Sequence, residues 1–140
     1  MREILFRGKR IDNGEWVYGD LMTEYPHHKG LTIVEYSCVY HEVDPKTLGQ
    51  YTGLKDRNGV KIFEGDITFH HRHKIKAYWE WHADHACFVG REISYDEPLI
   101  SRYYIRLDEP DLEVIGNKWD DSSLLLGGKQ DDSPELLGVE

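Results

Sequence analysis

Histidines and a cysteine in the second half of the chain are the residues best suited to carry chemistry. His82, His85 and Cys87 lie within six residues, and three more histidines stand between positions 70 and 73. Imidazole and thiolate are the ligands that zinc prefers. A turn between positions 82 and 85 would bring His82, His85 and Cys87 together as a zinc site. Because no Cys-x-x-Cys pair supports such a site, the sequence favours solvated histidines and no cofactor.

Three cations, Arg72, Lys74 and Lys76, form a second candidate site beside a run of aromatic residues. Small β-barrels bind single-stranded nucleic acid by stacking bases on aromatic side chains over a basic groove. Alternation along this run predicts Lys74 and Lys76 on the solvent face and Trp79 and Trp81 in the core. Because buried tryptophans cannot stack on bases, the pattern favours a half-buried strand over a nucleic-acid site.

The distribution of charge also argues against binding to nucleic acid. The net charge is −9, and residues 108–140 hold ten acidic residues and two lysines, which leaves −1 for residues 1–107. Binding to the phosphate backbone needs clustered lysine and arginine, which a nearly neutral body with an acidic end does not supply. We therefore do not expect nucleic acid to be the main partner.

The sequence shows no arrangement typical of an enzyme. Carboxylates such as Asp20, Glu64, Asp66 and Glu80 are available, but nothing in their spacing defines a catalytic pair. The chain has no Gly-x-Ser-x-Gly nucleophile motif and no phosphate-binding loop. We expect a protein without catalytic activity.

The fold class follows from two Asn-Gly pairs and from many aromatic and β-branched runs. Asn13-Gly14 and Asn58-Gly59 each separate two such runs and predict β-hairpin turns. We expect a mainly β protein of antiparallel strands and hairpins with a small barrel-like core, and at most short helical turns near the C-terminus, at 119–126. Strands are predicted at 3–11, 15–22, 31–43 (one or two strands), 47–54, 60–69, 74–81, 87–89, 102–107 and 112–115.

We expect one domain, because a chain of 140 residues is the size of a single ordinary core. The predicted domain spans residues 1–126, with an N-terminal hairpin region at 1–45 and a barrel-like region at 46–117. The Gly-rich, acidic segment 127–140 is typical of a flexible tail.

Three segments spread along the chain resemble the YopX family of phage and prophage proteins. They are the opening residues 2–8, the long central segment 50–67 and the closing residues 113–117. Residues 118–124 depart from the family pattern, and residues 70–106 show no match. The resemblance implies a β-rich fold and a phage or prophage origin, but no activity and no catalytic residues. Its turn-forming motif residues are Gly53, Asn58, Gly59, Gly65, Asp66, Gly116 and Asn117.

Together these features predict a non-enzymatic phage or prophage accessory protein that acts through contacts with an unknown host or phage protein. The alternatives are a nucleic-acid-binding β-barrel that uses Arg72, Lys74 and Lys76, and a zinc-dependent protein. Strand edges would also allow two copies of the chain to associate. No apolar run approaches a membrane span or a signal peptide, so we expect a cytoplasmic protein with Cys38 and Cys87 reduced.

Overall fold

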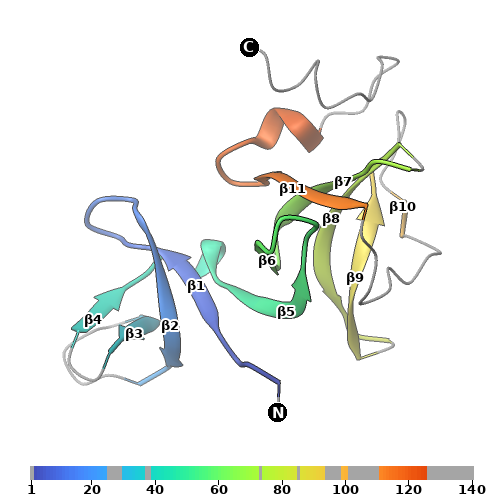
Figure 1. Cartoon of the computed structure of the whole chain (residues 1–140). Coiled ribbons are helices and arrows are strands. Elements are labelled where there is room, and N and C mark those ends of the chain that lie inside the picture. Colours follow the sequence, from blue (N-terminus) through green and yellow to red (C-terminus); the bar gives the residue numbers. More distant parts are fainter. Residues whose placement is uncertain are drawn as a thin grey trace. The chain divides into compact units, whose positions relative to one another are not determined.

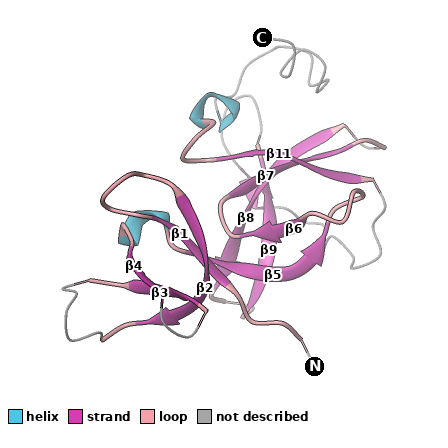
Figure 2. Ribbon diagram, turned by 60° about the vertical axis from the view of Figure 1, so that its left-hand side comes forward, coloured by secondary structure: helices cyan, strands magenta, loops and turns pink. Residues whose placement is uncertain are grey.

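The computed structural model shows a mainly antiparallel β protein, which confirms the predicted fold class (Figures 1 and 2). It divides into two compact units, residues 1–53 and 54–140. The structure describes residues 2–24, 30–36, 39–72, 74–84, 86–93, 99–100 and 111–125.

The first unit is a meander of four strands followed by a helical turn and the start of a fifth strand. The elements are β1 (Phe6–Lys9), β2 (Trp16–Met22), β3 (Thr32–Glu35), β4 (Val39–Glu42), η1 (Pro45–Thr47) and β5 (Gly49–Lys55). The predicted Asn13-Gly14 turn joins β1 to β2, and the Gly14 amide donates to the Arg10 carbonyl at 2.9 Å. Gly14 has a φ of +75°, which favours glycine. The first predicted hairpin is therefore confirmed.

The core of the first unit lies on one face of this meander. Val17, Ile33 and Val43 are buried there, and Phe6 and Leu21 pack against them. The helical turn η1 was not predicted; the sequence analysis expected helical turns only near the C-terminus. It forms where the Asp44 side chain accepts a hydrogen bond from the Lys46 amide at 3.0 Å, ahead of a proline in the first turn.

The second unit contains a five-stranded antiparallel sheet in the order β10-β9-β8-β7-β11. Its elements are β6 (Lys61–Phe63), β7 (Asp66–His70), β8 (Ile75–His82), β9 (Cys87–Glu92), β10 (Leu99–Ile100), β11 (Leu112–Asn117) and η2 (Ser122–Leu125). The turn η2 confirms the predicted C-terminal helical turn. The predicted strand at 102–107 and the tail at 127–140 lie outside the described residues.

The prediction of a barrel-like core is wrong in one respect, because the sheets are not closed. The other sheet has the order β4-β3-β2-β1-β5-β6, and among the described strands no pairing joins the two ends of either sheet. Closure into a barrel requires consistent stagger between all neighbouring strands. The alternation of residue types within single strands carries no information about that stagger. None of the described helical turns has the length or hydrophobicity of a membrane span.

Burial along β8 differs from the predicted alternation at two positions. Trp79 is buried as predicted, but Lys76 is only 4% exposed and Trp81 is 49% exposed. Lys76 lies opposite Phe69 on β7, a strand whose five residues are all buried. Trp81 lies one residue before the end of β8, beyond the core formed by Ile62, Trp79 and Leu112. A regular alternation predicts the side-chain direction but not what covers each face.

Candidate functional site

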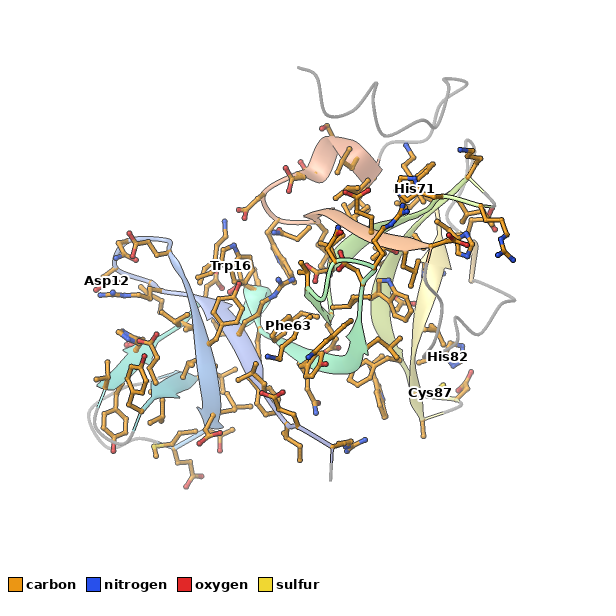
Figure 3. The ribbon with its side chains drawn as sticks, in the orientation of Figure 1. Asp12, Trp16, Phe63, His71, His82 and Cys87 are labelled. Carbon is orange, nitrogen blue, oxygen red and sulfur yellow. The ribbon has the colours of Figure 1, made fainter. Side chains whose placement is uncertain are left out.

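The structure brings two of the three predicted zinc ligands together. His82 ends β8 and Cys87 begins β9, and the two residues are directly paired across the antiparallel ladder. Figure 3 shows both side chains at the same end of this hairpin. Both are partly buried. His85 falls in the connecting turn but lies outside the described residues, so the three-ligand site remains a prediction.

His70 lies opposite Ile75 at the start of β8 and His71 follows it, so these two histidines lie at the other end of β8 and cannot join this site; His73 lies outside the described residues. That strand has eight residues, which corresponds to about 25 Å. His71 instead contacts Glu113 of β11, with 2.7 Å between its Nε2 and Oε1 of the carboxylate, and its ring packs edge-on against Phe69. Figure 3 shows His71 far from His82 and Cys87. The cluster in the sequence is therefore split between two ends of the sheet.

The three candidate nucleic-acid-binding cations have different environments. Arg72 is exposed and lies 3.3 Å from the carboxylate of Asp111. Lys74 is exposed, with its ammonium 5.9 Å from the centre of the Phe69 ring. Lys76 is buried. Only Arg72 and Lys74 could meet a phosphate without rearrangement, so a binding role for this set remains a prediction with two accessible members.

The motif residues Asn58 and Gly59 belong to a turn held by a carboxylate that the sequence analysis did not single out. Oδ1 of Asp56 accepts hydrogen bonds from the amides of Asn58 at 2.8 Å and Val60 at 2.9 Å. Its Oδ2 accepts from the amide of Val114 at 2.9 Å. An Asp two residues before an Asn-Gly pair is a signal for such a turn. The contact with β11 had no local signal, because 58 residues separate the partners.

The motif residues Gly65 and Asp66 form the tight turn between β6 and β7. The buried carboxylate of Asp66 accepts a hydrogen bond from the Phe63 amide at 2.8 Å. Gly65 has a φ of +88°, and its amide donates to the Trp79 carbonyl at 2.7 Å. A Cβ at Gly65 would lie 2.2 Å from the Trp119 ring. The ring can therefore pack here only because position 65 has no side chain.

We expect Gly65→Ala to lower the free energy of unfolding by about 2–3 kcal/mol, through backbone strain and the clash with Trp119. Gly59→Ala is the matched control, since Gly59 has a similar φ of +82° and open space around its Cβ position. It should cost only about 1 kcal/mol. Denaturant unfolding of both variants, with Gly65→Ala repeated in a Trp119→Ala background, measures the coupling. Equal costs at positions 65 and 59 would contradict the packing argument.

Gly116 and Asn117 hold the turn that follows β11. The Asn117 amide donates to Oδ2 of Asp121 at 3.0 Å, and its side-chain Oδ1 accepts from the amides of Trp119 and Asp120. A Cβ at Gly116 would lie 2.6 Å from Oδ2 of Asp121. Gly53 lies within β5 with a φ of +92°. The described motif residues thus serve local folding, and none of them forms a reactive cluster.

The first unit contains a pocket of about 240 Å³ that is lined by both polar and apolar side chains. Its walls come from the residues that follow β1 and from β4. Hydrogen bonds join these two segments, from the Ile11 amide to the Glu42 carbonyl and from the Asp44 amide to the Lys9 carbonyl. The residues that line the pocket are Arg10, Ile11, Asp12, Tyr40, His41 and Glu42.

Ion pairs occupy most of the charged groups around this pocket. The Arg10 guanidinium donates twice to the Asp12 carboxylate, at 2.9 and 2.7 Å. These hydrogen bonds raise the pKa of Arg10 and lower the pKa of Asp12. Nε2 of His41 lies 2.8 Å from the carboxylate of Glu35. The sequence analysis missed this pocket, because its walls come from segments about 30 positions apart and only the fold places them side by side.

A cluster of Tyr78, Glu80 and Arg91 lies on the second sheet. Arg91 on β9 contacts the Glu80 carboxylate at 2.6 Å, and this hydrogen bond raises the pKa of Arg91. The Arg91 guanidinium lies 6.0 Å from the centre of the Tyr78 ring. Burial raises the pKa of Tyr78, and Glu80 adds to this effect; burial also raises the pKa of Tyr51 in the first unit.

These shifts predict a loss of stability at alkaline pH. A raised pKa means that the folded protein favours the neutral tyrosine. The stability that depends on the neutral side chain is fully present below the ordinary pKa of 10.0 and is lost as pH rises through the folded-state pKa. We expect tyrosinate absorbance during an alkaline titration to show a late component that Tyr78→Phe and Tyr51→Phe each reduce. A titration curve unchanged by both substitutions would contradict these shifts.

The fold defines the chain as an antiparallel β protein of two compact units. Most of its sequence motifs form turns between strands. The sequence profile of the YopX protein family matches residues 5–126. The chain belongs to the YopX family. It is similar to the crystal structure of protein EF1440 from Enterococcus faecalis, with 21% identity over 89% of this chain and 99% of that chain and a TM-score of 0.44. No curated protein sequence matches the chain.

Proposed function

We propose that this chain is a non-enzymatic phage or prophage accessory protein that binds another protein in the cytoplasm of a bacterial host. The observation that carries the proposal is a set of exposed apolar side chains next to the two ends of the terminal strand β4. Tyr36 is 81% exposed and Ile11 is 57% exposed, and Val39, the first residue of β4, is exposed as well. Exposed apolar side chains next to an edge strand are available to a partner that binds along that strand.

The position of β4 supports a protein partner. It is the terminal strand of its sheet, with its last residue, Glu42, bonded on the outer side to the Ile11 amide, and the pocket is lined by residues of β4 and by Arg10, Ile11 and Asp12. Edge strands bind extended segments of other proteins through main-chain hydrogen bonds, while neighbouring pockets take alternate side chains. The pocket with Ile11 and Tyr40 in its walls fits an apolar side chain of such a segment.

The environment of the carboxylates supports a role without catalysis. Asp56 and Asp66 accept hydrogen bonds from backbone amides that hold turns. Glu80 is paired with Arg91, and Glu113 lies against His71. A general acid or base must reach a substrate proton, and these groups are already engaged in stabilising the fold. Of the three cations considered for phosphate binding, Arg72 is paired with Asp111 and Lys76 is buried, which supports a protein over a nucleic acid as partner.

The test is a pull-down of the tagged protein from host cells after nuclease treatment, followed by mass spectrometry. We expect a stoichiometric protein that is retained at high salt and lost when Ile11→Lys and Val39→Lys are combined. Val60→Lys is the matched control, because Val60 is an exposed apolar residue of the second unit. Recovery of nucleic acid alone, lost at high salt, would contradict the proposal and direct mutation to Arg72 and Lys74.

A further inference from the structure

We propose that Asn58 is a site of spontaneous covalent modification, at which the folded protein converts the side-chain amide to aspartate and isoaspartate. The reaction requires an asparagine whose side chain can turn toward the backbone nitrogen of the next residue. A glycine in that next position leaves the nitrogen unshielded, because glycine has no Cβ. Of the three asparagines in the chain, Asn13 and Asn58 precede a glycine and Asn117 precedes a lysine.

The first step is a substitution at the side-chain carbon of Asn58. The backbone nitrogen of Gly59 loses its proton and bonds to Cγ, and the bond between Cγ and Nδ2 breaks, so that ammonia leaves and a succinimide ring remains. Water then opens the ring. Cleavage of the new bond to Cγ gives aspartate, and cleavage of the bond to the main-chain carbonyl carbon gives isoaspartate, whose backbone runs through the side chain. The reaction consumes one water, releases one ammonia and involves no oxidant or reductant.

Exposure and the position of the attacking nitrogen are alike in the two Asn-Gly turns. Both asparagines and both glycines are exposed. The Gly59 amide donates to the Asp56 carbonyl at 3.0 Å, and the Gly14 amide donates to the Arg10 carbonyl at 2.9 Å. Among the described residues, a Cβ at either glycine would meet nothing within 4 Å beyond its chain neighbours. The backbone of the two turns therefore predicts equal reactivity.

The side chains of Asn13 and Asn117 are held by hydrogen bonds. Oδ1 of Asn13 accepts from the Glu15 amide at 2.9 Å, which fixes the side chain against the turn. Both ends of the Asn117 amide are engaged, because Oδ1 accepts from two backbone amides and Nδ2 donates to the Asp120 carboxylate at 3.2 Å. Rotation of either side chain toward the next nitrogen must first break these contacts.

The side chain of Asn58 is not held in this way. Its backbone amide donates to Oδ1 of Asp56 at 2.8 Å, but in the part of the chain that the structure describes its side-chain amide makes no hydrogen bond. Cγ can therefore rotate to the nitrogen of Gly59 without losing a contact. Of the two Asn-Gly sequences, the structure leaves this one free to react and restrains the other.

The modification weakens the turn between β5 and β6. Aspartate at position 58 adds a carboxylate close to Asp56, and like charges repel. Isoaspartate lengthens the main chain by one carbon inside a turn whose amides at 58 and 60 share one oxygen of Asp56. The other oxygen of Asp56 binds the Val114 amide of β11. A slow chemical change at position 58 thus loosens the contact between this turn and the edge of the sheet.

The experiment is incubation of the purified protein at mildly alkaline pH, followed by peptide mass spectrometry that separates asparagine, aspartate and isoaspartate. We expect conversion at Asn58 to be about fivefold faster than at Asn13, the factor that corresponds to one ordinary hydrogen bond, with Asn117 unchanged. In denaturant the two Asn-Gly sites should convert at the same rate, because the hydrogen bond from Glu15 is lost. Conversion of Asn13 as fast as Asn58 in the folded protein, or no conversion at Asn58, would overturn the proposal.

Two variants connect the chemistry to the turn. Gly59→Ala should slow conversion at position 58 by about tenfold and leave Asn13 unchanged, because a side chain at position 59 shields the nitrogen. Asn58→Ser cannot form the succinimide, and it should keep its Tm during an incubation that lowers the Tm of the wild-type protein. Circular dichroism establishes that both variants are folded at the start. A wild-type Tm that stays constant while Asn58 is converted would contradict the loosening of the turn.

Discussion

The Gly19→Ala variant should lose about 3–5 kcal/mol of the free energy of unfolding in the first unit, because the new methyl group would overlap the backbone of the neighbouring strand. A Cβ at position 19 would lie 2.1 Å from the carbonyl oxygen of Val34 and 2.8 Å from its carbonyl carbon. Those atoms belong to β3, which is paired with β2 through Asp20 and Val34. The clash can be relieved only by separating the two strands.

The matched control for this variant is Gly30→Ala in the same unit. A Cβ there would approach only the Glu42 carboxylate, at 3.3 Å, which is the end of a flexible side chain. Hydrogen exchange at the buried residues Val17, Ile33 and Val43 assigns the loss of stability to the first unit. If the amides of these residues are equally protected from exchange in Gly19→Ala and Gly30→Ala, the close approach of β2 and β3 has no energetic consequence.

The second large effect is expected for Asp56→Ala, which should lower the free energy of unfolding by about 3–4 kcal/mol. The substitution removes the acceptor of three backbone hydrogen bonds, from the amides of Asn58, Val60 and Val114. A hydrogen bond to a charged group contributes about 1.5–3 kcal/mol. Asn58 and Val60 are exposed, so water replaces much of the loss at their amides, and the Val114 bond accounts for the larger part of the cost. The Val114 bond also ties the turn to β11, so its loss weakens the edge of the sheet.

Asp56→Asn tests the mechanism, because an amide side chain retains one oxygen acceptor and loses the other. Its cost should fall between those of the wild-type protein and Asp56→Ala. Asp12→Ala is the control for a carboxylate in an exposed turn, and we expect no measurable change because exposed ion pairs contribute little. Chemical denaturation with fluorescence detection gives the three values. An Asp56→Ala variant as stable as Asp12→Ala would refute the role of this carboxylate.

The sequence by itself determined the features that depend on neighbouring residues. Asn13-Gly14 and Asn58-Gly59 predicted two turns that the structure contains, because only a few residue types tolerate the backbone angles of such turns. Aromatic and β-branched runs predicted most of the strands and the antiparallel class. The motif segments also identified the family, since their turn residues must keep their spacing to form the same local contacts.

The tertiary structure decided which distant residues meet and which faces are covered. It placed His82 beside Cys87 but His71 at the other end of the sheet, because the register of β8 and not the spacing in the sequence sets these positions. It buried Lys76 and exposed Trp81, and left both sheets open. Residue alternation determines the direction of a side chain, whereas its burial and its partners depend on strands that are remote in the chain.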